Sequence, residues 1–270
     1  MSAALESPTA EQAVPSPAMT VTVVGCSGSY PGPDSSASCY LLEGQQDGRT
    51  WRVVLDLGSG SLGVLHRFVD PSTLDAVLVS HLHPDHFFDI SGLYVLWRYH
   101  PDGPRPRIPV WGPRGVARQC ARAYGLPRDP GMTDEFDFHE YDDTPIRLGP
   151  FTIHAARVVH PVAAYGLRVE AGGRVLAYSG DTGPCRQLVD LAKGADLLLA
   201  ESAFVERPDN PVDLHLTGRQ AGAAATEAGA ARLVLTHIPP WHDPQVCLTE
   251  ARQVFHGPLD LAATGSTYVL

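Results

Sequence analysis

The chain has 270 residues, with 30 Asp and Glu against 20 Lys and Arg, 12 His and a formal net charge of −10. Its 44% hydrophobic and 19% charged residues exclude wholesale disorder. No apolar run approaches the roughly 18 residues that a membrane span needs, so we expect no membrane partner. The acidic balance argues against a surface that follows a long phosphate backbone, but it leaves room for a small anion held by metal ions.

The N-terminal residues 1–19 are small, polar and proline-containing, and they lack the basic and apolar segments of a signal peptide. We therefore expect a disordered tail over residues 1–19 and a single domain over residues 20–270. The five cysteines include no C-x-x-C pair, so a disulfide framework is not expected. Free thiols favour a cytoplasmic protein.

Short apolar runs separated by Gly and Pro predict alternating strands and helices. In the first half we predict strands over residues 20–25, 39–43, 52–57, 76–80 and 108–111, and helices over residues 61–69, 87–99 and 113–124. The run before Ser80 is apolar at every position, which is typical of a strand covered on both faces.

The second half continues the same pattern. We predict strands over residues 136–141, 151–159, 165–170, 174–179, 196–200 and 233–236, and helices over residues 184–192, 217–229 and 248–255. Thr217 is suited to cap the second of these helices, and Gly229 is suited to end it. Strands and helices mixed throughout the chain indicate an α/β layered domain.

The densest group of metal-binding side chains directly follows the predicted strand 76–80. His81, His83, Asp85 and His86 lie within six residues. A turn at the end of a strand can direct all four side chains into one space, and imidazole with carboxylate suits Zn²⁺ or another borderline divalent ion. Four ligands around one ion would leave little room for a substrate, so the spacing favours two adjacent ions.

Three further metal-binding residues follow predicted strands. His160 comes after the strand 151–159, Asp181 after 174–179 and His237 after 233–236. A single histidine at a strand end is more often structural or solvated than a ligand. Residues at the ends of different strands of one sheet converge on one edge, however, so their shared position favours a common site.

The order of these motifs resembles the metallo-β-lactamase fold superfamily from about residue 21 to residue 256. That resemblance implies an α/β four-layer αβ/βα sandwich, in which two mixed β-sheets are flanked by helices. It also implies two divalent ions, with Zn²⁺ favoured and Mn²⁺ or Fe²⁺ as alternatives. The implied ligands of one ion are His81, His83 and His160, and those of the other are Asp85, His86 and His237. By the same resemblance Asp181 bridges the two ions, and Asp56 supports the site from behind.

A finer resemblance is to the ribonuclease Z branch, through residues 201–204, 215–217 and 235–237. It implies that Glu201 and His215 assist catalysis. Two ions can lower the pKa of a bridging water to about 7, and the resulting hydroxide would attack the phosphorus. Asp85 would hold one ion and accept a hydrogen bond from this nucleophile. His215, oriented by Glu201, would stabilise the phosphate oxygens or protonate the leaving 3′-oxygen.

The chain departs from ribonuclease Z in one respect. That family carries a protruding basic arm that grips tRNA, inserted between the His160-type and Asp181-type motifs. Here residues 160–181 hold only two predicted short strands and a turn, so a tRNA partner is not expected. The chain most resembles compact, arm-less actinobacterial relatives that include cyclic-nucleotide phosphodiesterases. This implies a small anionic phosphodiester substrate, such as 3′,5′-cyclic AMP.

Several alternatives stay open at the level of sequence. One is a ribonuclease Z-like tRNA 3′ endonuclease, another is a hydrolase of lactones or thioesters, and a third is a metal-binding module without activity. Candidate substrate contacts are Ser27, Ser29 and Tyr30 in a glycine-rich loop, and Arg98 in the predicted helix 87–99. Dimers are common in the superfamily, so a homodimer is a possible assembly.

Overall fold

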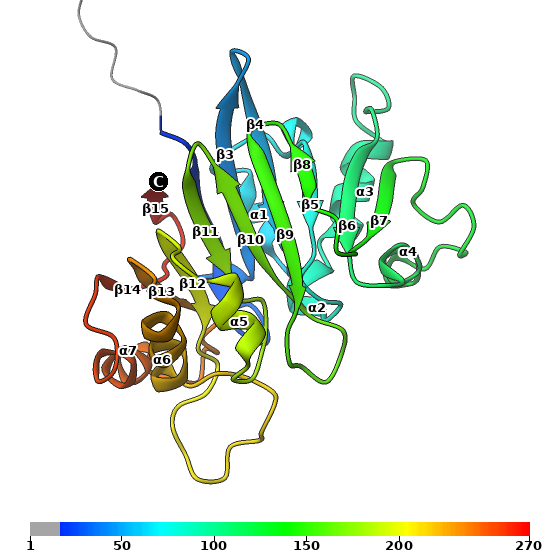
Figure 1. Cartoon of the computed structure of the whole chain (residues 1–270). Helices are drawn as coiled ribbons and strands as arrows, with labels where there is room; N and C mark the ends of the chain where they lie inside the picture. The colour runs from blue at the N-terminus through cyan, green and yellow to red at the C-terminus, as the bar shows by residue number, and fades with distance from the viewer. Residues whose placement is uncertain (1–16) are drawn as a thin grey trace, which may run out of the picture.

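The apolar runs of the two halves of the chain form two β-sheets that pack face to face, with helices on both outer faces (Figure 1). This architecture comes from a computed structural model, which describes residues 17–270. The first sheet carries α1, α3 and α4 on its outer face, and the second carries α5, α6 and α7. The expected four-layer αβ/βα sandwich is therefore confirmed.

The first sheet has the strand order β15-β1-β3-β4-β5-β6-β7, with β2 beside β1. Its strands are β1 (Thr20–Ser27), β2 (Ser36–Ala37), β3 (Cys39–Gln46), β4 (Arg49–Leu55), β5 (Ala76–Leu78), β6 (Ile108–Gly112), β7 (Phe136–Glu140) and β15 (Thr267–Val269). The helices of this half are α1 (Ser61–Leu65), α2 (Pro84–Phe87), α3 (Ile90–Arg98) and α4 (Val116–Tyr124), with a 3₁₀ turn at Pro71–Thr73.

The second sheet has the strand order β14-β13-β12-β11-β10-β9-β8. Its strands are β8 (Ile146–Leu148), β9 (Phe151–Arg157), β10 (Tyr165–Ala171), β11 (Arg174–Tyr178), β12 (Leu197–Glu201), β13 (Leu233–Thr236) and β14 (Leu259–Leu261). The helices of this half are α5 (Arg186–Leu191), α6 (Gly218–Ala228) and α7 (Pro244–Arg252).

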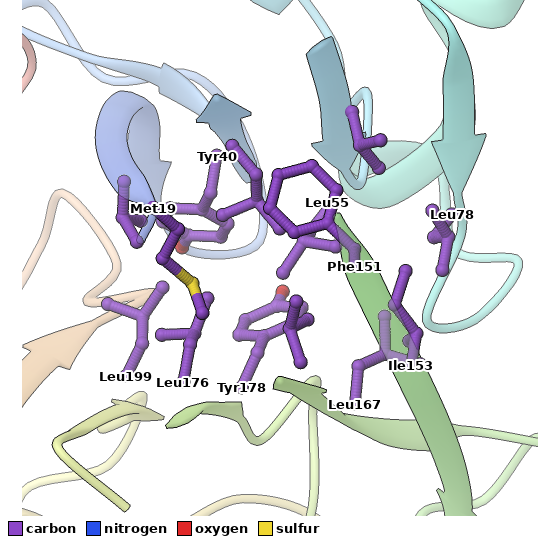
Figure 2. Close-up of a cluster of buried hydrophobic side chains, with 14 of the residues drawn as sticks. Met19, Tyr40, Leu55, Leu78, Phe151, Ile153, Leu167, Leu176, Tyr178 and Leu199 are labelled. Carbon is purple, nitrogen blue, oxygen red and sulfur yellow. The ribbon is translucent and has the colours of Figure 1, made fainter. Parts of the chain in front are cut away.

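The central core lies between the two sheets. Figure 2 shows Tyr40 and Leu55 from the first sheet facing Phe151, Leu167 and Tyr178 from the second. These five side chains are almost fully buried. Alternate residues of each strand fill this space, while the intervening residues pack under the helices of the same half. The apolar runs of the sequence are explained by strands that are covered on both faces.

The structure differs from the predicted elements mainly at short or terminal segments. The strands β2, β8, β14 and β15 were not expected, because two or three residues carry too little periodicity to reveal a strand. The last helix begins earlier than expected, since the Asp243 side chain accepts from the Gln245 N–H and Pro244 occupies the first turn.

The N-terminal boundary also differs from the expected tail over residues 1–19. Met19 is fully buried in the central core and exchanges backbone hydrogen bonds with Leu270. The ordered domain therefore starts before residue 20, and the expectation of disorder over residues 1–16 lies outside the described residues. None of the five cysteines is paired, and no helix within residues 17–270 is long and apolar enough to cross a membrane.

Strand direction brings the polar motifs to one edge of the sandwich. Strands β4 to β7 are parallel to one another, and so are β11 to β14. The carboxyl ends of parallel strands meet at the same edge, and polar residues follow β4, β5, β11 and β13 there. The candidate site is built along this edge.

Candidate metal centre

The histidine-rich motif leaves β5 and folds at once into a one-turn helix. His83 is the extended residue before α2, and Pro84 occupies the first turn, where its missing N–H is not needed. This turn buries Asp85 and His86 against the sheet, while His81 is held in the extended segment before it. Local geometry therefore directs the donor atoms of one short motif into a common space.

The first group of donor atoms consists of three imidazoles. His81 Nε2 lies 3.0 Å from His83 Nδ1, and His160 Nε2 lies 3.3 Å from the same His83 atom. His81 is fully buried, whereas His83 and His160 are half-buried. We call these three residues the outer group.

The second group consists of two imidazoles and two carboxylates, all buried: Asp85, His86, Asp181 and His237. The Nε2 atoms of His86 and His237 are 3.1 Å apart, and Asp85 Oδ2 is 3.1 Å from His237 Nε2. We call these four residues the inner group. Their donor atoms all lie within 4.8 Å of one another, as do those of the outer group.

Asp181 belongs to the inner group and also reaches the outer group. Its Oδ1 is 3.3 Å from His86 Nε2 in the inner group, and its Oδ2 is 3.6 Å from His81 Nε2 in the outer group. Gly180, directly before it, has a φ of 57°, a left-handed conformation that suits glycine. One carboxylate thus reaches both groups with different oxygens.

The donor set fits divalent cations. Asp181 Oδ1 is buried and has no hydrogen-bond partner among residues 17–270, a cost that a cation would remove. Burial and the neighbouring His86 lower the pKa of His81 well below its usual value, which keeps the imidazole in the neutral, metal-binding form. Clustered imidazoles and carboxylates make this a divalent metal site with donors for two ions.

Asp56 supports the inner group from behind. Its Oδ2 accepts hydrogen bonds from His86 Nδ1 at 2.7 Å, Ser80 Oγ at 2.8 Å and the Tyr178 hydroxyl at 2.7 Å, and its Oδ1 accepts from the Ser80 N–H at 2.6 Å. Because the bond to Asp56 occupies Nδ1 of His86, Nε2 is left to face the other donors. Asp56 itself has a φ of 59°, a conformation that this network of bonds holds in place.

Sequence reasoning anticipated Asp56 but missed Tyr178 and the role of Ser80. Tyr178 is the last residue of β11 and is fully buried between the sheets (Figure 2). Burial raises the pKa of Tyr178 well above its usual value, so its hydroxyl stays a hydrogen-bond donor. The available signal was its place in the chain, three residues before Asp181 at the same strand end.

His215 lies beside the cluster and is held by Glu201. Its Nδ1 donates to Glu201 Oε1 at 2.9 Å and lies 3.9 Å from Asp181 Oδ2. Glu201 is fully buried at the end of β12 and also accepts from the backbone N–H groups of Thr182 and Ala203. Burial lowers the pKa of His215, but the charge and hydrogen bond of Glu201 outweigh this effect and raise it to about 9.

Hydrogen bonds hold the chain on both sides of His215, at Leu214 and at Thr217. Two residues later, the Thr217 side chain accepts a hydrogen bond from the Gln220 N–H in a capping box that begins α6. The sequence predicts the Thr217 cap. One residue earlier, the carbonyl oxygen of Leu214 accepts from His160 Nδ1 at 2.9 Å. This last contact was missed, because a backbone acceptor leaves no side-chain signal in a sequence.

The four expected substrate contacts divide into two sets. Ser27 ends β1, and Ser29 and Tyr30 lie on the loop that follows it and runs beside His237. Arg98 is instead at the end of α3, where its guanidinium donates to Glu135 at 2.7 Å. The structure does not bring Arg98 to the cluster, because α3 carries it along the outer face of the first sheet, away from the motif that precedes the helix.

Comparison with known sequences gives a consistent family. The family described as "Beta-lactamase superfamily domain" matches residues 52–238. The chain is 44% identical over 253 residues to the uncharacterized protein Rv1339 of Mycobacterium tuberculosis, covering 92% of this chain and 91% of that one. It is also 30% identical to ribonuclease Z of Myxococcus xanthus over 308 aligned positions, covering 93% of this chain and 98% of the relative.

Solved structures agree with this result. The metallo-β-lactamase fold protein YhfI of Bacillus subtilis matches with a TM-score of 0.81 and 30% identity, over 93% of this chain and 98% of that one. Human tRNase Z, short form, matches with a TM-score of 0.68 and 22% identity over 92% and 98% of the two chains. A diphosphatase of the PhnP family matches with a TM-score of 0.72 and 18% identity over 93% and 98%. The last two similarities concern the fold.

Proposed function

The chain belongs to the beta-lactamase superfamily, close to its ribonuclease Z members, and from this premise we propose that it hydrolyses phosphodiesters. The substrate we propose is a 3′,5′-cyclic nucleotide such as cyclic AMP. Membership of the family supports a hydrolase, and relatives named as ribonuclease and diphosphatase act on bonds to phosphorus. The narrower choice of a cyclic nucleotide is our own inference.

In this proposal the seven clustered side chains hold two divalent ions, with Zn²⁺ favoured by the imidazole-rich donor set. The outer group would hold one ion and the inner group the other, and Asp181 would contact both. When bound, the ions would supply charge to hold a phosphate and would acidify a water. Asp85, at the 3.1 Å contact with His237, would also accept a hydrogen bond from that water.

The contact between His215 and Glu201 is the single observation that carries the proposal. Since Nδ1 of His215 is bound to Glu201, its Nε2 is left for a ligand, and the buried carboxylate stabilises the protonated ring. A protonated imidazole beside the cluster can donate to a phosphate oxygen or protonate a leaving 3′-oxygen. A phosphodiester carries a negative charge that this cation attracts, whereas a lactone or thioester does not.

A tRNA 3′ endonuclease is the second candidate, because of the 30% identity to ribonuclease Z. Three observations favour the small substrate over tRNA. Between His160 and Asp181 the chain has only β10, β11 and their turns. The alignment with ribonuclease Z spans 308 positions but covers 93% of the 270 residues here, so ribonuclease Z has segments that this chain lacks. A net charge of −10 also opposes a long polyanion.

A hydrolysis panel with the metal-loaded protein tests the proposal. The substrates are cyclic AMP, cyclic GMP, a 2′,3′-cyclic nucleotide, bis-p-nitrophenyl phosphate, pre-tRNA, a lactone and a thioester. We expect the highest kcat/KM for a 3′,5′-cyclic nucleotide. Cleavage of pre-tRNA as the fastest reaction would select the second candidate. Turnover of the lactone or thioester without any phosphodiester would overturn both.

A further inference from the structure

We propose that Tyr30 and Trp241 form an aromatic platform, next to the metal centre, that stacks against the base of a nucleotide. The inference rests on the proposed function, and it names the part of the substrate that the metal ligands cannot recognise. The platform is defined by these two residues, which come from the loops after β1 and after β13.

The two rings lie together and face solvent. Their centroids are 5.4 Å apart with an interplanar angle of 39°. Tyr30 is 47% exposed and Trp241 is 58% exposed, while the other three tryptophans of the chain, Trp51, Trp97 and Trp111, are buried or half-buried. A single exposed apolar side chain is ordinary, but a pair of large exposed aromatic rings in contact marks a surface that is suited to binding.

The backbone ties this platform to a residue of the inner group. Ser27 and Ile238 form an isolated β-bridge, and the Gly28 N–H donates to the Ile238 carbonyl at 3.2 Å. A Cβ at Gly28 would lie 2.3 Å from the carbonyl oxygen of His237, so only glycine permits this approach. The loop after β1 is thus packed directly on His237.

Chain connectivity limits how far the rings can be from the metal centre. Tyr30 is two residues beyond Gly28, a reach of about 7.6 Å between Cα atoms. The hydroxyl of Ser27 also donates to the Tyr30 carbonyl at 2.7 Å, which holds the loop close to the end of β1. Trp241 follows His237 by four residues, through Pro239 and Pro240, which stiffen the connection.

A nucleotide has one part that suits the metal centre and another part that suits the aromatic platform. Its phosphate suits the cation-binding cluster, and its base has a π face that stacks on aromatic side chains whatever the sequence. A hollow lined in part by His215, about 330 Å³ in volume, is a poorer place for the base. Its lining combines Arg207 with the carboxylates of Glu206 and Asp213, and it offers one phenyl ring, Phe204, where the platform has two rings in contact.

Binding of AMP, measured by calorimetry, tests the platform without any hydrolysis, and ribose 5-phosphate serves as the probe without a base. We expect Trp241→Leu and Tyr30→Leu to weaken AMP binding, with Trp241→Leu weakening it about tenfold, and to leave ribose 5-phosphate binding unchanged. Trp241→Phe, which keeps a ring, should restore most of the affinity. Tyr99→Leu is the matched control, because Tyr99 is 66% exposed but lies at the end of α3.

With cyclic AMP as substrate, the same variants should raise KM by about the same factor and leave kcat within about twofold. Unchanged AMP affinity in Trp241→Leu would overturn the platform. So would equal weakening of AMP and ribose 5-phosphate, since the loop would then only support His237. If Trp241→Leu turned a dimer into a monomer in light scattering without changing affinity, the rings would be a contact between two copies, and the proposal would also fail.

These outcomes separate the platform from the proposed function. A protein that loses AMP affinity on Trp241→Leu, but hydrolyses no phosphodiester, would keep the platform and refute the function. A protein that hydrolyses cyclic AMP with the same KM in wild type and Trp241→Leu would keep the function and refute the platform.

Discussion

The inner and outer groups of donor atoms differ in their residue types and in their burial. All four residues of the inner group are buried, and two of them, Asp85 and Asp181, are carboxylates. The outer group has three neutral imidazoles, and two of these, His83 and His160, are half-buried. Negative charge and burial both strengthen the hold on a cation, so the inner group should bind its ion more tightly.

The groups also differ in what supports them. His86 of the inner group is held by Asp56, within a network that reaches both sheets. His160 of the outer group is held by a backbone carbonyl, Leu214, in the loop between β12 and α6. The difference teaches that the inner group is supported by the buried core, whereas His160 of the outer group depends on a loop.

The largest effect should come from removing the residue that joins the two groups. We expect Asp181→Ala to lose metal and activity together, with turnover reduced by roughly 10⁴-fold or more, since several kcal/mol of charge stabilisation depends on both ions. Metal content by mass spectrometry and turnover of the best substrate measure this. Asp190→Ala, which alters a surface pair with Arg186, is the control. Full activity with intact metal in Asp181→Ala would refute the bridging role.

The second-largest effect should come from a substitution that lowers turnover without removing metal. We expect His215→Ala to reduce kcat by about 10²- to 10³-fold, the range usual for a lost general acid, while both ions stay bound. The reason is that His215 contacts Glu201 and lies beside the donors without completing either group. Kinetics and metal analysis of the same preparation test it. An enzyme that His215→Ala leaves unaffected would eliminate this role.

Metal removal should then distinguish the groups from each other. We expect graded chelation to release one ion at a roughly tenfold lower chelator concentration than the other, because the outer group is less buried and carries no carboxylate of its own. We expect His83→Ala to start with about one ion per chain. Release of both ions in a single step, or two ions retained in His83→Ala, would contradict the distinction.

The smallest effect should come from the support of the inner group. Tyr178→Phe removes one of four hydrogen bonds to Asp56 and leaves the ring in the core. We expect a loss of about 1 kcal/mol in the free energy of unfolding and about tenfold in metal affinity. Thermal unfolding and metal titration measure the two. Tyr40→Phe, whose hydroxyl binds Thr236, is a control that should lower stability but not metal affinity.

Much of this fold and site could be predicted from the sequence, because the metal-binding residues follow strands. His81 to His86 form one local motif, and His160, Asp181 and His237 share the position after a strand. The structure brings all of them together with Asp56, Glu201 and His215. Arg98 was predicted as a substrate contact only because it is a charged residue in an aromatic-rich helix. Its guanidinium instead pairs with Glu135, which lies 37 residues further along the chain, and no local pattern reveals that pairing.

Other features were beyond reach for physical reasons. The Leu214 carbonyl is a backbone acceptor that every residue type has, so nothing in the sequence distinguishes it. Tyr178 reads as a core aromatic until the partner sheet is placed against it. The strands β14 and β15 are three residues long, and their pairing depends on distant segments and not on local pattern.

The hydrogen bond between Tyr178 and Asp56 has a consequence for how the protein is assembled. It joins residues 122 positions apart, one directly after β4 of the first sheet and the other at the end of β11 of the second. A nascent chain that ends before β9 would already have the motif of His81 to His86, but it would lack Tyr178, Asp181 and every strand of the second sheet except β8. Full metal loading must therefore wait until the two halves have docked, and bound metal becomes a reporter of maturation.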